Sequence, residues 1–269
     1  MKLIAEPGQV SPAPPGTGDR WTRERVLSIR HWTPILLSFR TTRYAGFRFT
    51  PGHYARLGLT DGAAGNTVWR PYSIVSASHA DYLEFLAVRV PGGAFSERLA
   101  TLSEGNTIFV EKPSYGFMTL DQLAPGRDLW LIASGTGLGP FISILQEPDL
   151  CQHFSRLIVI HSVRHHAELA YRDDIASLQQ QALQSGTRLE YVPIVTREPG
   201  VGLFAARIPL LLDDGRLERR LGPLSVADSR VMVCGNPELT AALRRQLLAR
   251  GFATARRGIP GQMAFENYW

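Results

Sequence analysis

The sequence predicts a two-part protein: an antiparallel β-barrel, followed by an α/β unit with a doubly wound parallel sheet. Three observations favour this fold. The chain has 269 residues, more than one small core needs. As far as Lys112, short β-rich runs alternate with turn residues, which is typical of a small barrel. From Asp128 onward, apolar strands alternate with helical patterns, which indicates a parallel sheet.

The first part is expected to hold six strands and one helix. Turn dipeptides such as Pro51-Gly52 and Asp61-Gly62 separate the strands. A short helix is predicted at residues 95–102. The strands are expected at residues 26–29, 35–39, 53–57, 70–76, 82–90 and 107–110.

The second part begins with the unbroken apolar run of residues 129–133, read as a buried strand. Further strands are expected at residues 157–160, 189–195 and 231–233, and helices at 140–145, 168–183 and 239–249. Residues 1–20, with four prolines and three glycines, predict a flexible tail. With a joint in residues 113–127, the predicted domains are residues 21–125 and 126–269.

Composition narrows the function. No apolar run approaches the roughly 20 residues of a membrane helix, and the start lacks a signal peptide's apolar region, so we expect a cytoplasmic protein with no membrane partner.

The two cysteines, Cys151 and Cys234, are too few for an iron–sulfur cluster. His165 and His166 are adjacent on one turn and face different ways, so no metal site is predicted. The net charge of +5 suits an acidic partner, a phosphorylated ligand or nucleic acid, or is merely a solvated surface.

A glycine turn, Gly135-Thr136-Gly137-Leu138-Gly139-Pro140, follows the first strand of the second part. A strand, glycines and a helix start together direct backbone N–H groups toward an anion, as in dinucleotide-binding folds. Pro140 suits the first turn of a helix. The spacing departs from the usual G-x-G-x-x-G, and the glycines are alternatively only turn residues.

Three arginines follow strands of the predicted parallel sheet. The strand before Arg164 ends without the carboxylate that holds an NAD ribose. Arg197, preceded by Thr196, and Arg207 come after the next strand. Guanidinium groups bind phosphate in a bidentate way, so the pattern indicates NADP rather than NAD. The alternative is three solvated surface arginines.

Another strand end carries Cys234-Gly235-Asn236-Pro237. The carboxyl edge of a parallel sheet is where open α/β folds bind ligands, and glycine beside the thiol lets a flat ring approach. The alternative is a small buried cysteine.

In the barrel, Arg70-Pro71-Tyr72-Ser73 combines a positive charge, an aromatic ring and a hydroxyl, which suits a flavin. Strand alternation points Ser73 away from the other two, so curvature or a bulge must bring it to the ring. The N–H groups of residues 92–96 are candidates for the flavin pyrophosphate. The alternative is an edge strand with a surface arginine and a core tyrosine. The aromatic end of the chain, Tyr268-Trp269, is read either as a cofactor stack or as a docked tail.

From Trp21 to Trp269 these motifs, in this order, resemble the bacterial ferredoxin/flavodoxin–NADP reductases, with a chain end similar to the enterobacterial branch. The resemblance implies bent FAD, with Ser73, Cys234, Glu266 and Tyr268 in catalysis and a C-terminal tail that returns to the flavin. In the plant members the chain ends in tyrosine, whereas here Trp269 is added. The cofactor contacts that follow are Arg70, Pro71, Tyr72, Ser73, Ala87, Ala94, Phe95, Ser96, Gly135, Thr136, Gly137, Arg164, Thr196, Arg197, Arg207, Cys234, Gly235, Asn236, Tyr268 and Trp269.

The expected activity is electron transfer between NADPH and a small one-electron carrier, by way of a hydride passed to flavin N5. The expected partners are an acidic ferredoxin or flavodoxin and NADPH, with the protein acting as a monomer. A free-flavin or oxygenase-component reductase is the alternative enzyme. A barrel that binds nucleic acid is the alternative from another class, and it leaves the glycine turn and the arginines unused. The carrier, the direction of electron flow and the role of residues 1–20 stay open.

Overall fold

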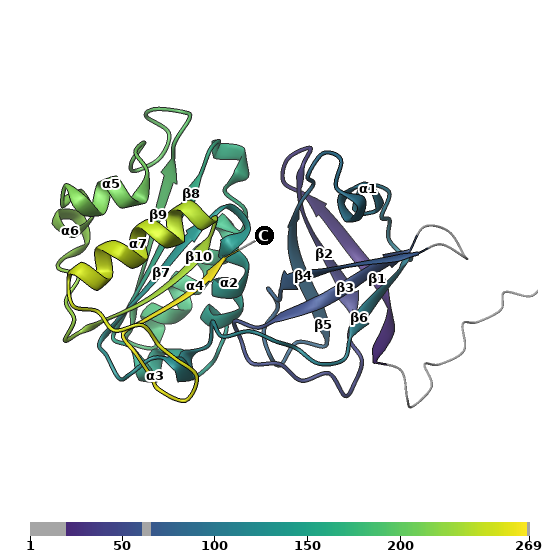
Figure 1. The fold of residues 1–269 in the computed structure, drawn as a ribbon, viewed down its shortest axis with the longest axis horizontal. Helices are drawn as coiled ribbons and strands as arrows, with labels where there is room; N and C mark the ends of the chain where they lie inside the picture. Colours follow the sequence, from purple (N-terminus) through teal and green to yellow (C-terminus); the bar gives the residue numbers. More distant parts are fainter. Residues whose placement is uncertain (1–19, 61–65, 268–269) are drawn as a thin grey trace, which may run out of the picture.

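The computed structural model describes residues 20–60 and 66–267, which form two lobes side by side (Figure 1). The predicted tail, residues 1–20, lies outside the described residues except for Arg20. Each lobe is built on its own β-sheet, and the two sheets follow one another along the chain. None of the helices in the described part of the chain is long and apolar enough to cross a membrane.

An antiparallel sheet of six strands, in the order β4-β3-β6-β1-β2-β5, forms the first lobe. A register shift between Val26 and Ser28 bends β1, whose first half pairs with β6 and whose second half pairs with β2. The sheet curls until its ends approach, with a bridge between Ile74 and Phe85. This curled sheet confirms the predicted antiparallel barrel. Its elements are β1 (Trp21–His31), β2 (Leu36–Thr42), β3 (Tyr54–Thr60), β4 (Thr67–Ser73), β5 (Tyr82–Val88), α1 (Ala94–Ala100) and β6 (Thr107–Glu111).

The second lobe confirms the predicted doubly wound fold. Its five strands are parallel, in the order β11-β10-β7-β8-β9. One face packs on α2 and α4, and the other on α5, α6 and α7, each through an apolar cluster. The elements are β7 (Asp128–Ser134), α2 (Gly139–Leu145), α3 (Leu150–His153), β8 (Arg156–Val163), α4 (Arg172–Gln184), β9 (Arg188–Val195), α5 (Ile208–Asp213), α6 (Arg216–Leu221), β10 (Ser229–Gly235), α7 (Pro237–Ala249) and β11 (Met263–Asn267), with 3-10 turns η1 (Leu120–Gln122), η2 (Gly135–Leu138) and η3 (His166–Glu168).

Some of these elements differ from the sequence prediction. The helix predicted at residues 168–183 begins only at Arg172, because Tyr171 takes a left-handed backbone conformation with φ of 60° and η3 precedes it. Sequence reasoning missed the short helices α3, α5 and α6, and it missed β11. That last strand pairs with β10, so residues 263–267 extend the parallel sheet.

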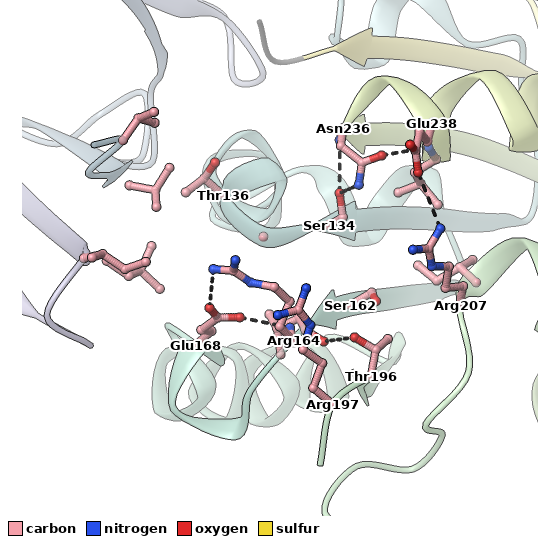
Figure 2. A pocket seen from close by; sticks show the side chains of 18 of the residues that line it. Ser134, Thr136, Ser162, Arg164, Glu168, Thr196, Arg197, Arg207, Asn236 and Glu238 are labelled. Carbon is pink, nitrogen blue, oxygen red and sulfur yellow. Dashed lines mark hydrogen bonds and ion pairs between the residues drawn. The ribbon is translucent and has the colours of Figure 1, made fainter. Parts of the chain in front are cut away.

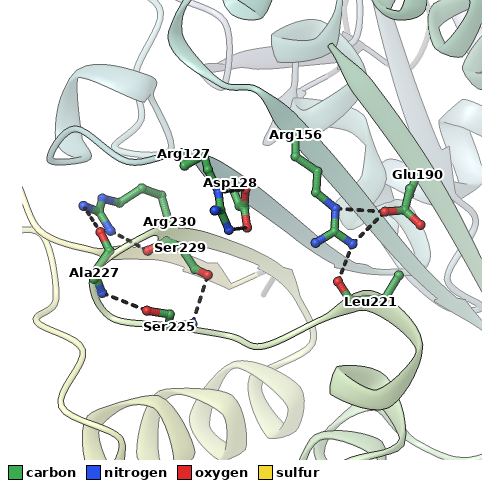
Figure 3. A network of polar contacts seen from close by, with 9 residues as sticks. All are labelled: Arg127, Asp128, Arg156, Glu190, Leu221, Ser225, Ala227, Ser229 and Arg230. Atoms are coloured by element: carbon green, nitrogen blue, oxygen red, sulfur yellow. Dashed lines mark hydrogen bonds and ion pairs between the residues drawn. The ribbon is translucent and has the colours of Figure 1, made fainter.

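Arg230 fastens the segment that joins the lobes to the second lobe, and Figure 3 shows this side chain beside Ala227 and Ser229. This buried side chain donates hydrogen bonds to the carbonyl oxygens of Ala124, at 2.8 Å, and of Pro125. It also donates to Ser229, at 2.6 Å, and to other carbonyls of the loop before β10. Carbonyl oxygens thus satisfy a buried cation, and the path of the chain into β7 is fixed.

The lobes share a continuous apolar core in which all seven residues of α2 are buried. Val75 and Leu86 of the first lobe pack in the same cluster as Leu131 and Phe141 of the second. Because interiors of this kind pack densely, the relative position of the two sheets is constrained.

Polar contacts reinforce this shared core. The Tyr171 hydroxyl donates to Glu84 Oε1 at 2.8 Å, and Arg40 Nε donates to Glu84 Oε2 at 2.8 Å. Elsewhere in the interface, Ser143 Oγ donates to the carbonyl of Ser76 at 2.8 Å. Burial raises the pKa of Tyr171 well above its ordinary value, and the Glu84 charge adds to this. Tyr171 therefore remains a donor across the interface.

We predict that Tyr171→Phe lowers the free energy of unfolding by about 2 kcal/mol, the usual worth of a hydrogen bond to a charged group. Urea unfolding followed by tryptophan fluorescence measures this. The matched control is Tyr44→Phe, at an exposed tyrosine, which should change stability by less than about 0.5 kcal/mol. Equal effects of the two variants would contradict the role given to the Tyr171 hydroxyl.

Candidate active site between the two sheets

The glycine turn lies where the two lobes meet. After β7 the chain forms η2 and then α2, which starts at Gly139 with Pro140 in its first turn. Gly135 has φ of 53°, a left-handed conformation that glycine adopts without steric cost. The predicted strand–turn–helix unit is therefore present, with a 3-10 turn between strand and helix.

Two glycines of this turn contact opposite lobes. A Cβ atom on Gly137 would lie 2.1 Å from the carbonyl oxygen of Cys234. A Cβ atom on Gly139 would lie 3.3 Å from Val75 Cγ2 and 3.9 Å from Ser73 Cβ. The turn thus separates Ser73, at the end of β4, from Cys234, in β10, by little more than its own thickness. Two residues that sequence reasoning assigned to one reaction lie on either side of one turn.

Strand β4 presents the residues predicted to hold a flavin. It is an edge strand of its sheet, with β3 as its hydrogen-bonded neighbour. Arg70 and Pro71 are exposed, Tyr72 is half-buried and Ser73 is buried. The Tyr72 ring packs on Phe95 with centroids 5.3 Å apart, and burial raises its pKa to about 12 although Arg70 opposes this. A neutral, supported aromatic ring beside a guanidinium suits a flat anionic ligand.

Two of the predicted flavin contacts, Ala87 and Ser96, make contacts within the first lobe. Ala87 is fully buried in the apolar core of the first sheet, so its side chain offers no surface to a ligand. Ser96 is buried, and its hydroxyl accepts a hydrogen bond from the N–H of Val90 at 3.0 Å. Ala94 is exposed at the start of α1. The Ser96 hydroxyl therefore holds the preceding turn in shape.

A cavity of about 860 Å³ opens between the lobes (Figure 2). The first lobe contributes Val88 to Pro91, and the second contributes Gly135, Thr136 and the three predicted arginines. Ser134, Thr196 and Asn236 also line it. An opening that combines an apolar wall with three guanidinium groups fits a phosphorylated dinucleotide.

The arginines of the cavity come from different segments. Arg164 follows β8, Arg197 follows β9, and Arg207 precedes α5. The N–H of Arg197 donates to the carbonyl of Arg164 at 2.9 Å, which sets the first two side by side. Sequence reasoning expected these three in one pocket, and the structure brings them to one cavity.

Two carboxylates that sequence reasoning did not assign also face this cavity. Glu168 accepts from Arg164 Nη2 at 2.7 Å and from its backbone N–H at 2.9 Å. Glu238 lies 3.4 Å from Arg207 Nη1. Burial alone would raise the pKa of Glu168, but the Arg164 hydrogen bonds outweigh it and hold the pKa below its usual range. The i,i+4 spacing of Arg164 and Glu168 was a signal in the sequence.

Cys234, Gly235 and Asn236 form the far side of the turn. Cys234 is fully buried. A Cβ atom on Gly235 would lie 2.2 Å from Ser134 Oγ, so only glycine allows this approach. Asn236 caps α7 by accepting from the N–H of Leu239 at 2.9 Å, and its own N–H donates to Ser134 Oγ at 3.1 Å. The motif thus ties β7 to β10 at the edge of the cavity.

Glu266 stands on β11 directly opposite Cys234 of β10. It is half-buried, and burial raises its pKa to about 7. A carboxyl group with such a pKa exchanges protons readily at neutral pH. Tyr268 and Trp269, the predicted ring-stacking residues, lie outside the described residues.

The adjacent histidines have separate partners. His165 Nδ1 lies 3.1 Å from Glu198 Oε1, and His166 Nε2 lies 2.7 Å from Arg172 Nη1. Across residues 20–60 and 66–267, no three His, Cys, Asp or Glu side chains gather as metal ligands would.

Comparison with known proteins adds to this geometry. Residues 28–118 match the oxidoreductase FAD-binding domain family, and residues 131–245 match the oxidoreductase NAD-binding domain family. A ferredoxin–NADP reductase A of Sorangium cellulosum is 38% identical over 253 residues, covering 92% of this chain and 90% of the relative. A flavodoxin/ferredoxin–NADP reductase of Escherichia coli is 34% identical over 251 residues, covering 93% and 99%.

A solved structure agrees with these relatives. The ferredoxin NADP+ reductase of Neisseria gonorrhoeae, with bound FAD and NADP, superposes with a TM-score of 0.86 at 36% identity. The match covers 93% of this chain and 100% of that one. A match over 93% of the 269 residues must include both lobes.

We predict that Gly137→Ala destabilises the protein by about 1–3 kcal/mol, because the added methyl group overlaps the Cys234 carbonyl. Gly139→Ala is the matched control, since its methyl group would meet the Val75 side chain at 3.3 Å, a tight contact that a side chain can relieve by a small shift, whereas the Cys234 carbonyl is backbone. Thermal unfolding of the two variants measures the difference. If Gly137→Ala is as stable as Gly139→Ala, the close approach of turn and β10 is wrong.

Glu266 predicts a pH dependence. Its pKa in the folded state lies above its ordinary value of 4.5, so folding favours the protonated form. That stabilisation is complete below about pH 4.5 and is lost as pH rises through about 7. Glu266→Gln cannot titrate, so we expect its stability relative to wild type to rise over this interval in urea unfolding. A difference between Glu266→Gln and wild type that stays constant over this interval would contradict the assignment.

Proposed function

The chain belongs to the ferredoxin/flavodoxin–NADP reductase family, and on that premise we propose how its own residues carry electrons between NADPH and a small one-electron carrier. The observation that supports the proposal most is the glycine turn, which has Ser73 on one side and Cys234 on the other. A flavin held by β4 and a nicotinamide held beside β10 would therefore meet across one thin segment of backbone.

The residues of β4 fit FAD. The exposed Arg70 supplies positive charge, and Tyr72, supported by Phe95, supplies a ring face. When bound, FAD supplies the redox chemistry: its N5 takes a hydride from NADPH, and its two electrons leave singly for the carrier. The protein's task is to hold the two reacting rings about 3–3.5 Å apart and to keep water away.

Ser73 and Glu266 are the groups we assign to proton handling and ring orientation. Ser73 lies at the end of β4 beside the turn, where its hydroxyl can hydrogen-bond a ring nitrogen. Glu266, with a pKa raised to about 7, is suited to hold or release a proton near Cys234. Cys234 would lie beside the nicotinamide site, where its fully buried side chain supports the backbone of Gly235 and Asn236. Tyr268 and Trp269 keep the roles that the family resemblance implies, shielding the flavin ring and stacking on adenine.

NADPH recognition is assigned to the arginines of the cavity. Arg164, Arg197 and Arg207 offer donors to a 2′-phosphate, and Thr196 lines the same cavity. Glu168 takes only one donor of the Arg164 guanidinium, from Nη2 at 2.7 Å, so the remaining N–H groups can bind phosphate oxygens while Glu168 keeps the side chain in place. An arginine held in place by a carboxylate loses less side-chain freedom when the phosphate arrives.

We assign the carrier a negatively charged docking face. Arginines that are exposed or half-exposed on the second lobe would steer such a partner, and the rate of this encounter should fall as salt rises. We propose that the protein acts as a monomer. The candidate docking arginines are Arg216, Arg219, Arg220, Arg244, Arg245, Arg256 and Arg257.

The test is flavin reduction in a stopped-flow instrument, on protein loaded with FAD. We expect NADPH to bleach the yellow flavin band far more efficiently than NADH. The double variant Arg164→Ala with Arg197→Ala should weaken NADPH binding by at least about 100-fold, since it removes two charged hydrogen bonds worth about 1.5–3 kcal/mol each. NADH should be little affected.

The matched control is Arg23→Ala with Arg25→Ala, which removes the same charge from exposed positions of β1. It should leave the reaction with both nucleotides unchanged. Equal use of NADPH and NADH by the wild type would refute the phosphate pocket, and failure to bind FAD would refute the proposed function.

A further inference from the structure

A buried histidine lies directly beneath the glycine turn. His161 belongs to β8, between Ala133 of β7 and Pro193 of β9, and only 1% of its surface is exposed. Its Nε2 lies 3.0 Å from the carbonyl oxygen of Gly135, and its Nδ1 lies 3.3 Å from the Tyr191 hydroxyl. Neither the resemblance nor the proposed mechanism gives this residue a role.

The partners of His161 define its protonation. A carbonyl oxygen can only accept, so the Nε2–H donates to Gly135. Nδ1 then accepts from the Tyr191 hydroxyl, whose pKa burial raises far above its ordinary value. Burial also lowers the pKa of His161 to about 4, against smaller opposing effects of Gly135 and Glu168. The imidazole is therefore neutral at physiological pH, with one fixed tautomer.

This hydrogen bond orients a peptide group of the turn. In a trans peptide the carbonyl of one residue and the N–H of the next point in opposite directions. Because His161 holds the Gly135 carbonyl toward the sheet, the N–H of Thr136 is directed away from the sheet, on the side of the cavity that both residues line. Nothing lies within 4 Å of a Cβ position on Gly135, so the space beside the turn is open at this point.

We propose that His161 is a positioning residue for dinucleotide binding: through the Gly135 carbonyl it holds the glycine turn in the orientation that receives the pyrophosphate and nicotinamide half of NADP(H). The inference rests on the proposed function, since it assumes that the cavity takes this nucleotide. His161 would act on the nucleotide only indirectly, through its hydrogen bond to the Gly135 carbonyl.

Three variants separate the hydrogen bond from the bulk of the side chain. His161→Met fills similar space without a donor. His161→Gln retains an N–H₂ group at about the reach of Nε2. Tyr191→Phe alters the same buried region but leaves the bond to Gly135 in place, so it serves as the matched control.

The measurement is calorimetric titration of FAD-loaded protein with NADP+ and, separately, with 2′-phospho-AMP. The second ligand keeps the adenosine, its 2′-phosphate and its 5′-phosphate but lacks the second phosphate and the nicotinamide riboside, so it reports the adenosine half of the site, which includes the arginines. We expect His161→Met to weaken NADP+ about 10-fold and 2′-phospho-AMP less than 2-fold. His161→Gln and Tyr191→Phe should both stay within about 3-fold of wild type for NADP+. Amide hydrogen exchange in residues 135–138 should be faster in His161→Met than in the other proteins.

Other results overturn the inference. Tight NADP+ binding by His161→Met, or equal weakening of both ligands, would show that the hydrogen bond does not position the turn. Failure of His161→Gln to restore binding would do the same. A wild type that binds 2′-phospho-AMP and FAD but not NADP+ would instead refute the proposed function and this inference with it.

Discussion

The close approach of the glycine turn to both lobes is the constraint on which the site depends. Gly137 leaves no room for a methyl group against the Cys234 carbonyl, and Gly139 packs beside Ser73. Any side chain at position 137 would push the second lobe's strands away from the turn, and with them the surface offered to a nicotinamide. A two-cofactor reaction needs its partners within contact distance, and in the proposed site the thickness of the glycine turn would set that distance.

Rigidity around the turn has several sources. The wholly buried α2 places an apolar wall behind it, and Tyr171 bonds to Glu84 across the interface. The lobes are therefore unlike domains joined by a flexible linker, because their core is continuous. A charged side chain of the cavity is also held in place, because Glu168 forms an ion pair with the Arg164 guanidinium.

Sequence reasoning reached the architecture, and it expected in one pocket the three arginines that the structure brings to one cavity. Alternation of apolar runs was enough for the two sheets, and the strand ends located Arg164, Arg197 and Arg207. It missed β11, whose five residues carry no turn signal or periodicity of their own and become a strand only by pairing with β10. It placed the start of α4 too early, because the left-handed Tyr171 is fixed by its contacts with the other lobe rather than by local propensity. Ala87 and Ser96 were assigned to the flavin, but burial and the Val90 bond could be known only from packing.

The central claim is that one backbone turn separates the two redox partners. A crystal structure of the protein with FAD and NADP+ tests it most directly. The account predicts the flavin ring against Tyr72 and Ser73, the 2′-phosphate among the arginines, and the dinucleotide running along the glycine turn toward Cys234. A flavin or a dinucleotide bound on the outer face of either sheet, away from this turn, would contradict the account.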